Sequence, residues 1–268
     1  MSDWDVSGWE WKTGKGLPYL TCHLLQPWPH GFFTQQHWPQ TPEDLVAELA
    51  EGLPVYRVKQ VHGCEVLTPQ EVLAFLTAEE RSEGARPEAD ALITGDAQQS
   101  VWVCTADCNP VLIADAQTGQ VAAIHAGWRG TSLKVVPLTI KRMVANGSRL
   151  QDLRIAMGPA IAGEVYQVST HVAADVGRTI VPEHANWDDE QLVQFLQTQA
   201  NPAVLPDPEP GRARLDVRRV NALQLEHLGI APEQVAIAPH CTYQEPDRFF
   251  SYRRTKEKKV QWSGIVST

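Results

Sequence analysis

Residues 101–130 read VWVCTADCNPVLIADAQTGQVAAIHAGWRG, and this stretch decides the fold. Two apolar runs, residues 111–114 and 121–124, flank a turn that contains Gln117-Thr118-Gly119. Apolar runs on both sides of a short turn with a glycine are typical of an antiparallel β-hairpin. We therefore predict a hairpin over this part of the chain.

The register of this hairpin brings two reactive side chains together. If the turn is tight, Val111 lies opposite Ile124, and the next position places His125 opposite Pro110. Pro110 follows Cys108 by two residues, and diagonal neighbours across a strand pair lie within about 7–8 Å. The thiol and the imidazole are therefore expected to reach one point in space.

Further strands and two helices are predicted around the hairpin. The predicted strands are residues 55–61, 89–94, 101–105, 111–114, 121–125, 153–157, 235–238 and 259–267. One helix is predicted over 131–145, with Thr131 as N-cap, and a second over 216–228, with Asp216 as N-cap and Gly229 as the stop. The proline-rich segment 202–211 is interpreted as a loop and not as a domain boundary. Residues 1–268 are therefore predicted to form a single α/β domain with mixed sheets.

Composition and charge exclude several classes of protein. Hydrophobic residues make up 43% of the 268 residues and charged residues 21%, which is ordinary for a globular chain and excludes global disorder. Lys and Arg number 23 against 32 Asp and Glu, so the net charge is −9. Because such a surface repels phosphate backbones and anionic lipid, neither nucleic acid nor a membrane is an expected partner.

The amino-terminal residues and the cysteines indicate a cytoplasmic protein. Residues 1–5 carry acids where a signal peptide carries bases, and no run approaches the roughly 18 apolar residues of a membrane helix. The five cysteines form an odd, sparse set, which favours thiols or metal ligands over a disulfide framework. A monomer or a small homo-oligomer is expected.

Cys108 and two histidines are the candidate metal ligands. Cys104 lies inside an apolar run and is interpreted as a buried structural cysteine, whereas Cys108 lies in a polar turn where a thiol is accessible. His62 precedes Gly63 at a predicted strand end; taken alone, such a histidine is more often a surface residue than a ligand. His62, Cys108 and His125 together would suit zinc, which prefers nitrogen and sulfur donors. His240, beside Cys241, is a reserve ligand.

The segment after His125 has features of an anion site. Gly127 and Gly130 allow close backbone approach before a predicted helix, and Arg129 between them offers a bidentate donor for phosphate. The alternative is that both glycines only shape the turn between strand and helix, with Trp128 in the core.

Seven segments of the chain carry a resemblance to a known family. They are Gln60-Val61-His62-Gly63, Ala89-Asp90-Ala91-Leu92-Ile93-Thr94, Ala106-Asp107-Cys108, His125-Ala126-Gly127-Trp128-Arg129-Gly130, Gly158-Pro159, Cys241-Thr242 and Phe250-Ser251-Tyr252-Arg253-Arg254. In these segments and in their order, the chain resembles the family first called laccase-domain or multicopper polyphenol oxidases. That family was later described as zinc-dependent purine nucleoside phosphorylases and peptidoglycan editing factors.

The resemblance implies a fold, a metal and an activity. It implies a four-layer α/β/β/α sandwich similar to the catalytic domain of cytotoxic necrotizing factors, and zinc on His62, Cys108 and His125. It also implies phosphorolysis of adenosine, inosine, guanosine and methylthioadenosine, with a purine nucleoside and phosphate as small-molecule partners. For this reaction Arg129 is expected to hold phosphate and Asp107 to transfer the proton; the alternative for Asp107 is that it only caps its turn through backbone N–H groups. Adenosine deamination in the same pocket is a further possible activity.

Three alternatives stay open. Two histidines and one cysteine also suit copper, so a copper-dependent polyphenol oxidoreductase is one of them. Against it, a multicopper oxidase builds a trinuclear site from His-x-His pairs, and this chain has none. The second is a hydrolase that edits a peptidoglycan precursor, in which Cys108 would be a nucleophile. The third, a protein without catalysis, leaves the clustered His, Cys, Asp and Arg side chains unexplained.

Overall fold

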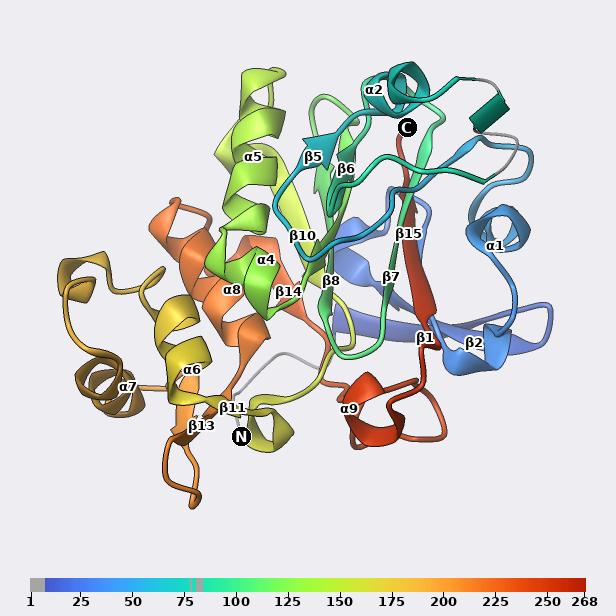
Figure 1. Ribbon diagram of the computed structural model, residues 1–268. Helices are drawn as coiled ribbons and strands as arrows, with labels where there is room; N and C mark the ends of the chain where they lie inside the picture. Colours follow the sequence, from blue (N-terminus) through green and yellow to red (C-terminus); the bar gives the residue numbers. More distant parts are fainter. Residues whose placement is uncertain (1–7, 78, 81–83) are drawn as a thin grey trace.

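Two six-stranded sheets face one another in the computed structural model, which describes residues 8–77, 79–80 and 84–268 (Figure 1). The first sheet has the strand order β1-β2-β3-β15-β7-β4 and the second β14-β10-β8-β9-β6-β5. A third sheet of three strands has the order β11-β13-β12. Each large sheet contains parallel and antiparallel pairs, so the predicted mixed α/β class is confirmed. Residues 1–5, which were interpreted as lacking a signal peptide, lie outside the described residues.

The bounds of the elements are as follows. The strands are β1 Trp9–Gly14, β2 Leu17–Cys22, β3 His30–Phe33, β4 Val55–Tyr56, β5 Val66–Leu67, β6 Ala91–Ile93, β7 Ser100–Thr105, β8 Asn109–Asp115, β9 Val121–Ala126, β10 Leu153–Met157, β11 Gln167–Ser169, β12 Val204–Pro206, β13 Arg212–Leu215, β14 Val235–Ile237 and β15 Gln261–Val266. The helices are α1 Pro42–Leu49, α2 Pro69–Phe75, α4 Trp128–Ser132, α5 Val135–Ala145, α6 Thr170–Gly177, α7 Asp189–Gln197, α8 Val217–His227 and α9 Tyr252–Thr255.

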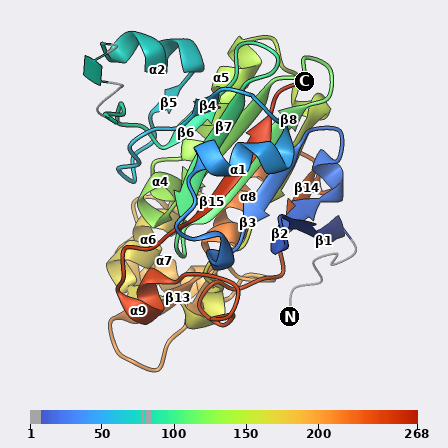
Figure 2. The ribbon, with the colours of Figure 1, turned by 90° about the vertical axis from the view of Figure 1, so that its right-hand side faces the viewer.

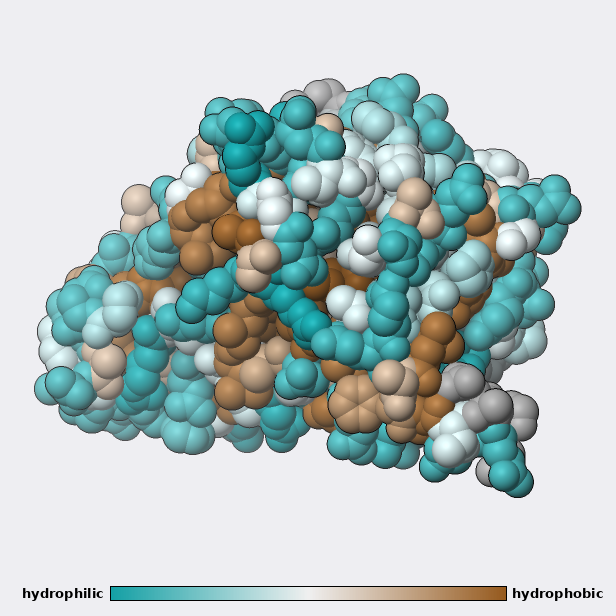
Figure 3. Space-filling model, turned by 90° about the horizontal axis from the view of Figure 1, so that it is seen from above, coloured by the Kyte–Doolittle hydropathy of each residue, from teal (hydrophilic) through white to brown (hydrophobic). Residues whose placement is uncertain are grey.

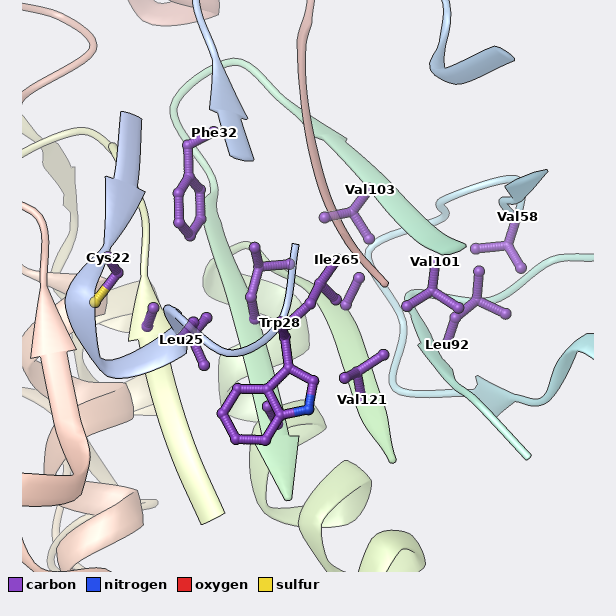
Figure 4. Close-up of a cluster of buried hydrophobic side chains, with 14 of the residues drawn as sticks. Cys22, Leu25, Trp28, Phe32, Val58, Leu92, Val101, Val103, Val121 and Ile265 are labelled. Atoms are coloured by element: carbon purple, nitrogen blue, oxygen red, sulfur yellow. The ribbon is translucent and has the colours of Figure 1, made fainter. Parts of the chain in front are cut away.

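The main core lies between the two large sheets. Figure 4 shows Val103 and Ile265 of the first sheet in one cluster with Leu92 and Val121 of the second. A second cluster joins the outer face of the second sheet to α5 and α8, and a third joins α1 to the outer face of the first sheet. Figure 2 shows β15 running through the middle of the first sheet beside β3, with α1 in front of it. Helices thus cover the outer faces of both large sheets, and β8 and β9 lie between these helices and the main core.

The β8–β9 hairpin has the predicted register. Val111 pairs with Ile124, and Pro110 pairs with His125. The turn is held by Asp115, whose carboxylate accepts hydrogen bonds from the N–H groups of Gln117 and Thr118. Cys108 lies in a bend over residues 106–108, where a polar turn is predicted, and Asn109 and Pro110 are the first two residues of β8. Cys108 therefore lies immediately before the strand.

The predicted helix over residues 131–145 is two helices. Thr131 is not an N-cap but lies inside α4, and the chain breaks at Lys134, which has a left-handed φ of +60°. The physical reason is Pro137, which has no N–H and would clash with the carbonyl four residues earlier in a continuous helix. In the observed structure Pro137 lies in the first turn of α5, where a proline is tolerated.

Two further predictions differ from the structure in part, and a third agrees with it. Only Val55–Tyr56 of the predicted strand 55–61 is a strand, because the segment then leaves the sheet. The predicted loop 202–211 contains the strand β12, which pairs with β13 across a turn. The second helix agrees, with Asp216 as the N-cap and Gly229 at a φ of +88° after its end.

The molecular surface is mixed. Seen from above, hydrophilic residues cover most of the molecule, and smaller hydrophobic patches lie between them (Figure 3). Among the described residues, no helix combines the length and the apolar character that crossing a membrane requires.

Candidate metal centre

His62, Cys108 and His125 meet at one point of the fold. His62 lies in a turn between β4 and β5, Cys108 precedes β8, and His125 belongs to β9. One ligand atom from each of the three residues lies within 4.8 Å of the others, and the two imidazole ring centroids are 4.8 Å apart. His62 is exposed, Cys108 is half-buried and His125 is buried. The structure therefore brings together the three side chains that the sequence singled out.

A strained residue orients Cys108. The preceding residue, Asp107, has a φ of +99°, which a side chain with a Cβ rarely adopts. Its carboxylate accepts a hydrogen bond from the Thr242 hydroxyl at 2.8 Å and another from the Arg253 N–H at 2.7 Å. These bonds hold the bend that turns Cys108 toward the two histidines.

The His62 turn is held by Asp90. His62 also has a left-handed φ, of +61°, and its N–H donates to the Asp90 carboxylate at 2.9 Å. The same carboxylate accepts a hydrogen bond from His125 Nδ1 at 2.7 Å. Burial alone would raise the pKa of Asp90, but the His125 bond and the N–H groups of Gly63 and Val61 lower it, so Asp90 is ionised.

The electrostatics of the centre favour a thiolate beside an imidazolium when no metal is bound. Burial opposes ionisation of Cys108, but the charge of His125 and hydrogen bonds from His125 and His62 outweigh it and lower the Cys108 pKa to about 6. For His125, burial is likewise outweighed by the Cys108 charge and the Asp90 hydrogen bond, and its pKa rises to about 9. Cys108 is thus already in the form that binds a metal ion near neutral pH.

This donor set fits zinc. Two imidazole nitrogens and one thiolate are the ligand types that zinc prefers, and three protein ligands leave a fourth position for substrate. Ligand atoms around a tetrahedral zinc lie roughly 3.5 Å apart, and the three candidate ligand atoms lie within 4.8 Å of one another.

Gly127 leaves the space that the centre needs. A Cβ at this position would lie 2.8 Å from Cys108 Sγ and 3.2 Å from His62 Cδ2. Its φ of −72° and ψ of 173° are ordinary, so only the close approach requires a glycine here. The sequence predicts either an anion site or a turn at Gly127, and the structure adds this close approach to two candidate ligands.

A cavity of about 240 Å³ opens beside the three candidate ligands. Its wall is formed by Gln60, His62, Cys104, Thr105, Ala106, Cys108, His125, Tyr252, Glu257, Lys258, Lys259 and Val260. Sequence reasoning gave no role to Gln60 or to residues 257–260. Gln60 lies in a family segment of the sequence, but residues 257–260 lie in none, and the two parts of the wall come from segments far apart in the chain.

Arg129 and Asp107 do not line this cavity. Arg129 is exposed on α4, with its guanidinium 4.5 Å from the centroid of the Trp128 ring. Burial and the charge of Cys108 raise the pKa of the Tyr166 phenol, whereas the charges of Arg253 and Arg129 act in the opposite direction. Arg129 is therefore within electrostatic reach of the same phenol as Cys108.

Comparison with known proteins gives consistent results. Residues 43–266 match the family described as multi-copper polyphenol oxidoreductase laccase. A purine nucleoside phosphorylase of Synechocystis sp. is 53% identical over 259 residues, which cover 97% of each chain. An adenosine deaminase from an unknown prokaryotic organism is 31% identical over 196 residues, which cover 73% of this chain and 68% of the relative.

The fold also matches a solved structure. The crystal structure of YlmD from Geobacillus stearothermophilus has a TM-score of 0.72 and 23% identity, over 96% of this chain and 98% of that chain.

Proposed function

Because the chain belongs to the multi-copper polyphenol oxidoreductase laccase family, we propose that it is an enzyme, a purine nucleoside phosphorylase that uses zinc. The similarity to the Synechocystis phosphorylase along almost the whole chain supports this activity. The observation that carries the proposal is the meeting of His62, Cys108 and His125 at the wall of a cavity. Copper is the alternative ion.

The proposed reaction is phosphorolysis. Phosphate attacks C1′ of the ribose while the bond to the purine nitrogen breaks, so the products are the free base and ribose 1-phosphate. Arg129 would hold the phosphate, and Asp107 would transfer the proton that the attacking phosphate loses to the leaving base. When bound to His62, Cys108 and His125, zinc supplies a Lewis acid that stabilises developing negative charge.

One incubation tests the activity. Purified protein of known zinc content is given adenosine with and without phosphate, and adenine is separated from inosine by chromatography. The proposal expects adenine and ribose 1-phosphate in equal amounts, and only when phosphate is present. Adenine formed equally well without phosphate would instead indicate a hydrolase.

Deamination is a second candidate activity. The similarity to an adenosine deaminase over 73% of this chain favours it. In that reaction water replaces the 6-amino group of adenosine and ammonia leaves, so the same incubation would yield inosine without a need for phosphate. Four features of the protein stay predictions. They are the range of nucleosides, the cytoplasmic location, the single-domain organisation of residues 1–268 and the kinship with cytotoxic necrotizing factors.

Arg129→Ala is expected to raise the KM for phosphate about 10- to 100-fold and to change the KM for adenosine much less. The reason is the loss of one charge-assisted hydrogen bond, which contributes about 1.5–3 kcal/mol. The measurement is initial rate against phosphate concentration. Arg212→Ala removes the same charge from an exposed position in the third sheet and is the control. An unchanged KM for phosphate would remove Arg129 from the phosphate site.

Asp107→Asn is expected to lower turnover by about 100-fold while zinc content and melting temperature stay normal, because an amide cannot transfer the proton. The comparison variant is Glu257→Gln, since Glu257 lines the cavity but forms an ion pair with Lys259 at 3.1 Å. Loss of turnover in Glu257→Gln alone would assign proton transfer to Glu257. A lowered melting temperature with normal turnover in Asp107→Asn would leave Asp107 a turn residue.

A further inference from the structure

Asp90 has hydrogen bonds to both segments that carry the candidate histidine ligands. Its Oδ1 accepts from His125 Nδ1 at 2.7 Å and from the His62 N–H at 2.9 Å. Its Oδ2 accepts from the Gly63 N–H at 2.6 Å and the Val61 N–H at 3.2 Å. The Asp90 side chain is fully buried, and within the described part of the chain these four N–H groups are its hydrogen-bond donors.

The bond to His125 fixes which ring nitrogen faces the centre. A carboxylate can only accept hydrogen bonds, so His125 Nδ1 carries the proton in this contact. Nε2 is then the nitrogen left for Cys108 and for a metal ion. The backbone holds the same arrangement, because the His125 N–H donates to the Asp90 carbonyl oxygen at 2.8 Å.

The bonds to residues 61–63 fix a turn that is unfavourable by itself. His62 has a left-handed φ of +61°. Among the hydrogen bonds of the described residues, Asp90 is the buried carboxylate that holds both the His62 turn and the His125 ring. Three successive N–H groups point at one carboxylate, which is the arrangement that backbone turns use to bind an anion. Asp90 is the built-in anion of this turn.

We propose that Asp90 is a positioning residue that sets both histidines of the metal centre, the ring of His125 through Nδ1 and the turn of His62 through its backbone. The inference rests on the proposed metal centre. It adds that the geometry of two ligands depends on one carboxylate that does not itself contact the metal. Outer groups of this kind typically change metal affinity by about 10- to 100-fold when they are removed.

Asp90→Asn tests the proposal. Asparagine has one acceptor oxygen and an NH₂ group that donates, so it cannot accept from the four N–H groups that face Asp90. We expect zinc affinity, measured by competition with a chromophoric chelator, to fall about 10- to 100-fold. In the zinc-bound protein we also expect the nuclear magnetic resonance signal of the His125 Nδ1 proton, protected by the carboxylate in the wild type, to be lost.

Asp115→Asn is the matched control. Asp115 is also a fully buried aspartate in the second sheet, and its carboxylate accepts from the N–H groups of Gln117 and Thr118. It lies at the opposite end of β8 from Cys108, at a distance of roughly 20 Å along the strand. Asp115→Asn therefore removes a buried carboxylate that holds a turn. We expect the zinc affinity and the His125 signal to stay unchanged in this variant.

The outcomes separate the inference from the function on which it rests. Equal zinc affinity in Asp90→Asn and wild type, or an equal loss in Asp115→Asn, would overturn the role of Asp90 and leave the metal centre in place. A wild-type protein that binds no zinc would overturn the centre and the inference together. If Asp90→Asn does not fold, Asp90→Glu replaces it. Asp90→Glu is expected to keep the His125 signal and to bind zinc more weakly. Wild-type zinc affinity in Asp90→Glu would contradict the proposal.

Discussion

Cys108→Ala is expected to abolish phosphorolysis, with turnover reduced by about a thousandfold or more, and to remove most of the bound zinc. Cys108 is the proposed sulfur donor of the centre, and its pKa, lowered to about 6, favours the thiolate that binds metal at neutral pH. When several residues act together in catalysis, removing one of them abolishes most of the rate enhancement that the whole group provides. The measurement is zinc per chain after gel filtration, together with the initial rate.

Cys104, which lines the same cavity as Cys108, provides the control for this experiment. Burial raises the pKa of Cys104 to about 12, so it is a neutral thiol, and Cys104→Ala is expected to keep its zinc. A Cys108→Ala protein with full zinc but no activity would contradict the ligand role and favour a nucleophilic cysteine. A Cys108→Ala protein with both zinc and activity would remove Cys108 from the site.

Gly127→Ala is expected to weaken zinc binding by about 10- to 100-fold and to reduce turnover in parallel. The added methyl group would lie 2.8 Å from Cys108 Sγ, which is closer than real Cβ atoms approach, so the sulfur must move out of position. Because the Gly127 backbone is ordinary, the substitution introduces no backbone strain, and the fold is expected to persist.

The control for Gly127 is Gly8→Ala, since a Cβ at Gly8 meets nothing within 4 Å. Zinc affinity is measured by chelator competition and folding by thermal melting in both variants. Wild-type zinc affinity in Gly127→Ala would show that the centre does not need this close approach, and that the ligand geometry described here is wrong.

The hairpin could be predicted from sequence because its information is local. Two apolar runs on either side of a short turn determine which residues pair, and the predicted partner of Pro110 is the observed one, His125. The helix after it could not be predicted correctly from apolar spacing alone, because Pro137 breaks the pattern that the spacing suggests. The three-stranded sheet was missed because its strands are short and β12 lies in a proline-rich segment.

The site divides in the same way. The three ligand candidates are reactive side chains at element ends, where sequence patterns are informative. The cavity wall from residues 252–260 and the four bonds of Asp90 depend on segments that meet only in the folded chain. For Asp90, the signal in the sequence was its place in a family segment, which gave no indication of its contacts. For Gly127, the family segment gave the residue but not its close approach to the Cys108 sulfur.

We propose that one metal ion on His62, Cys108 and His125 is needed for phosphorolysis of a purine nucleoside. The most direct measurement is a titration of the metal-stripped protein with zinc, in adenosine and phosphate, with ribose 1-phosphate followed as the product. We expect the rate to rise linearly and to level off at one zinc per chain, and copper to restore little of it. A metal-stripped protein that is fully active, or one that is activated only by copper, would contradict the account.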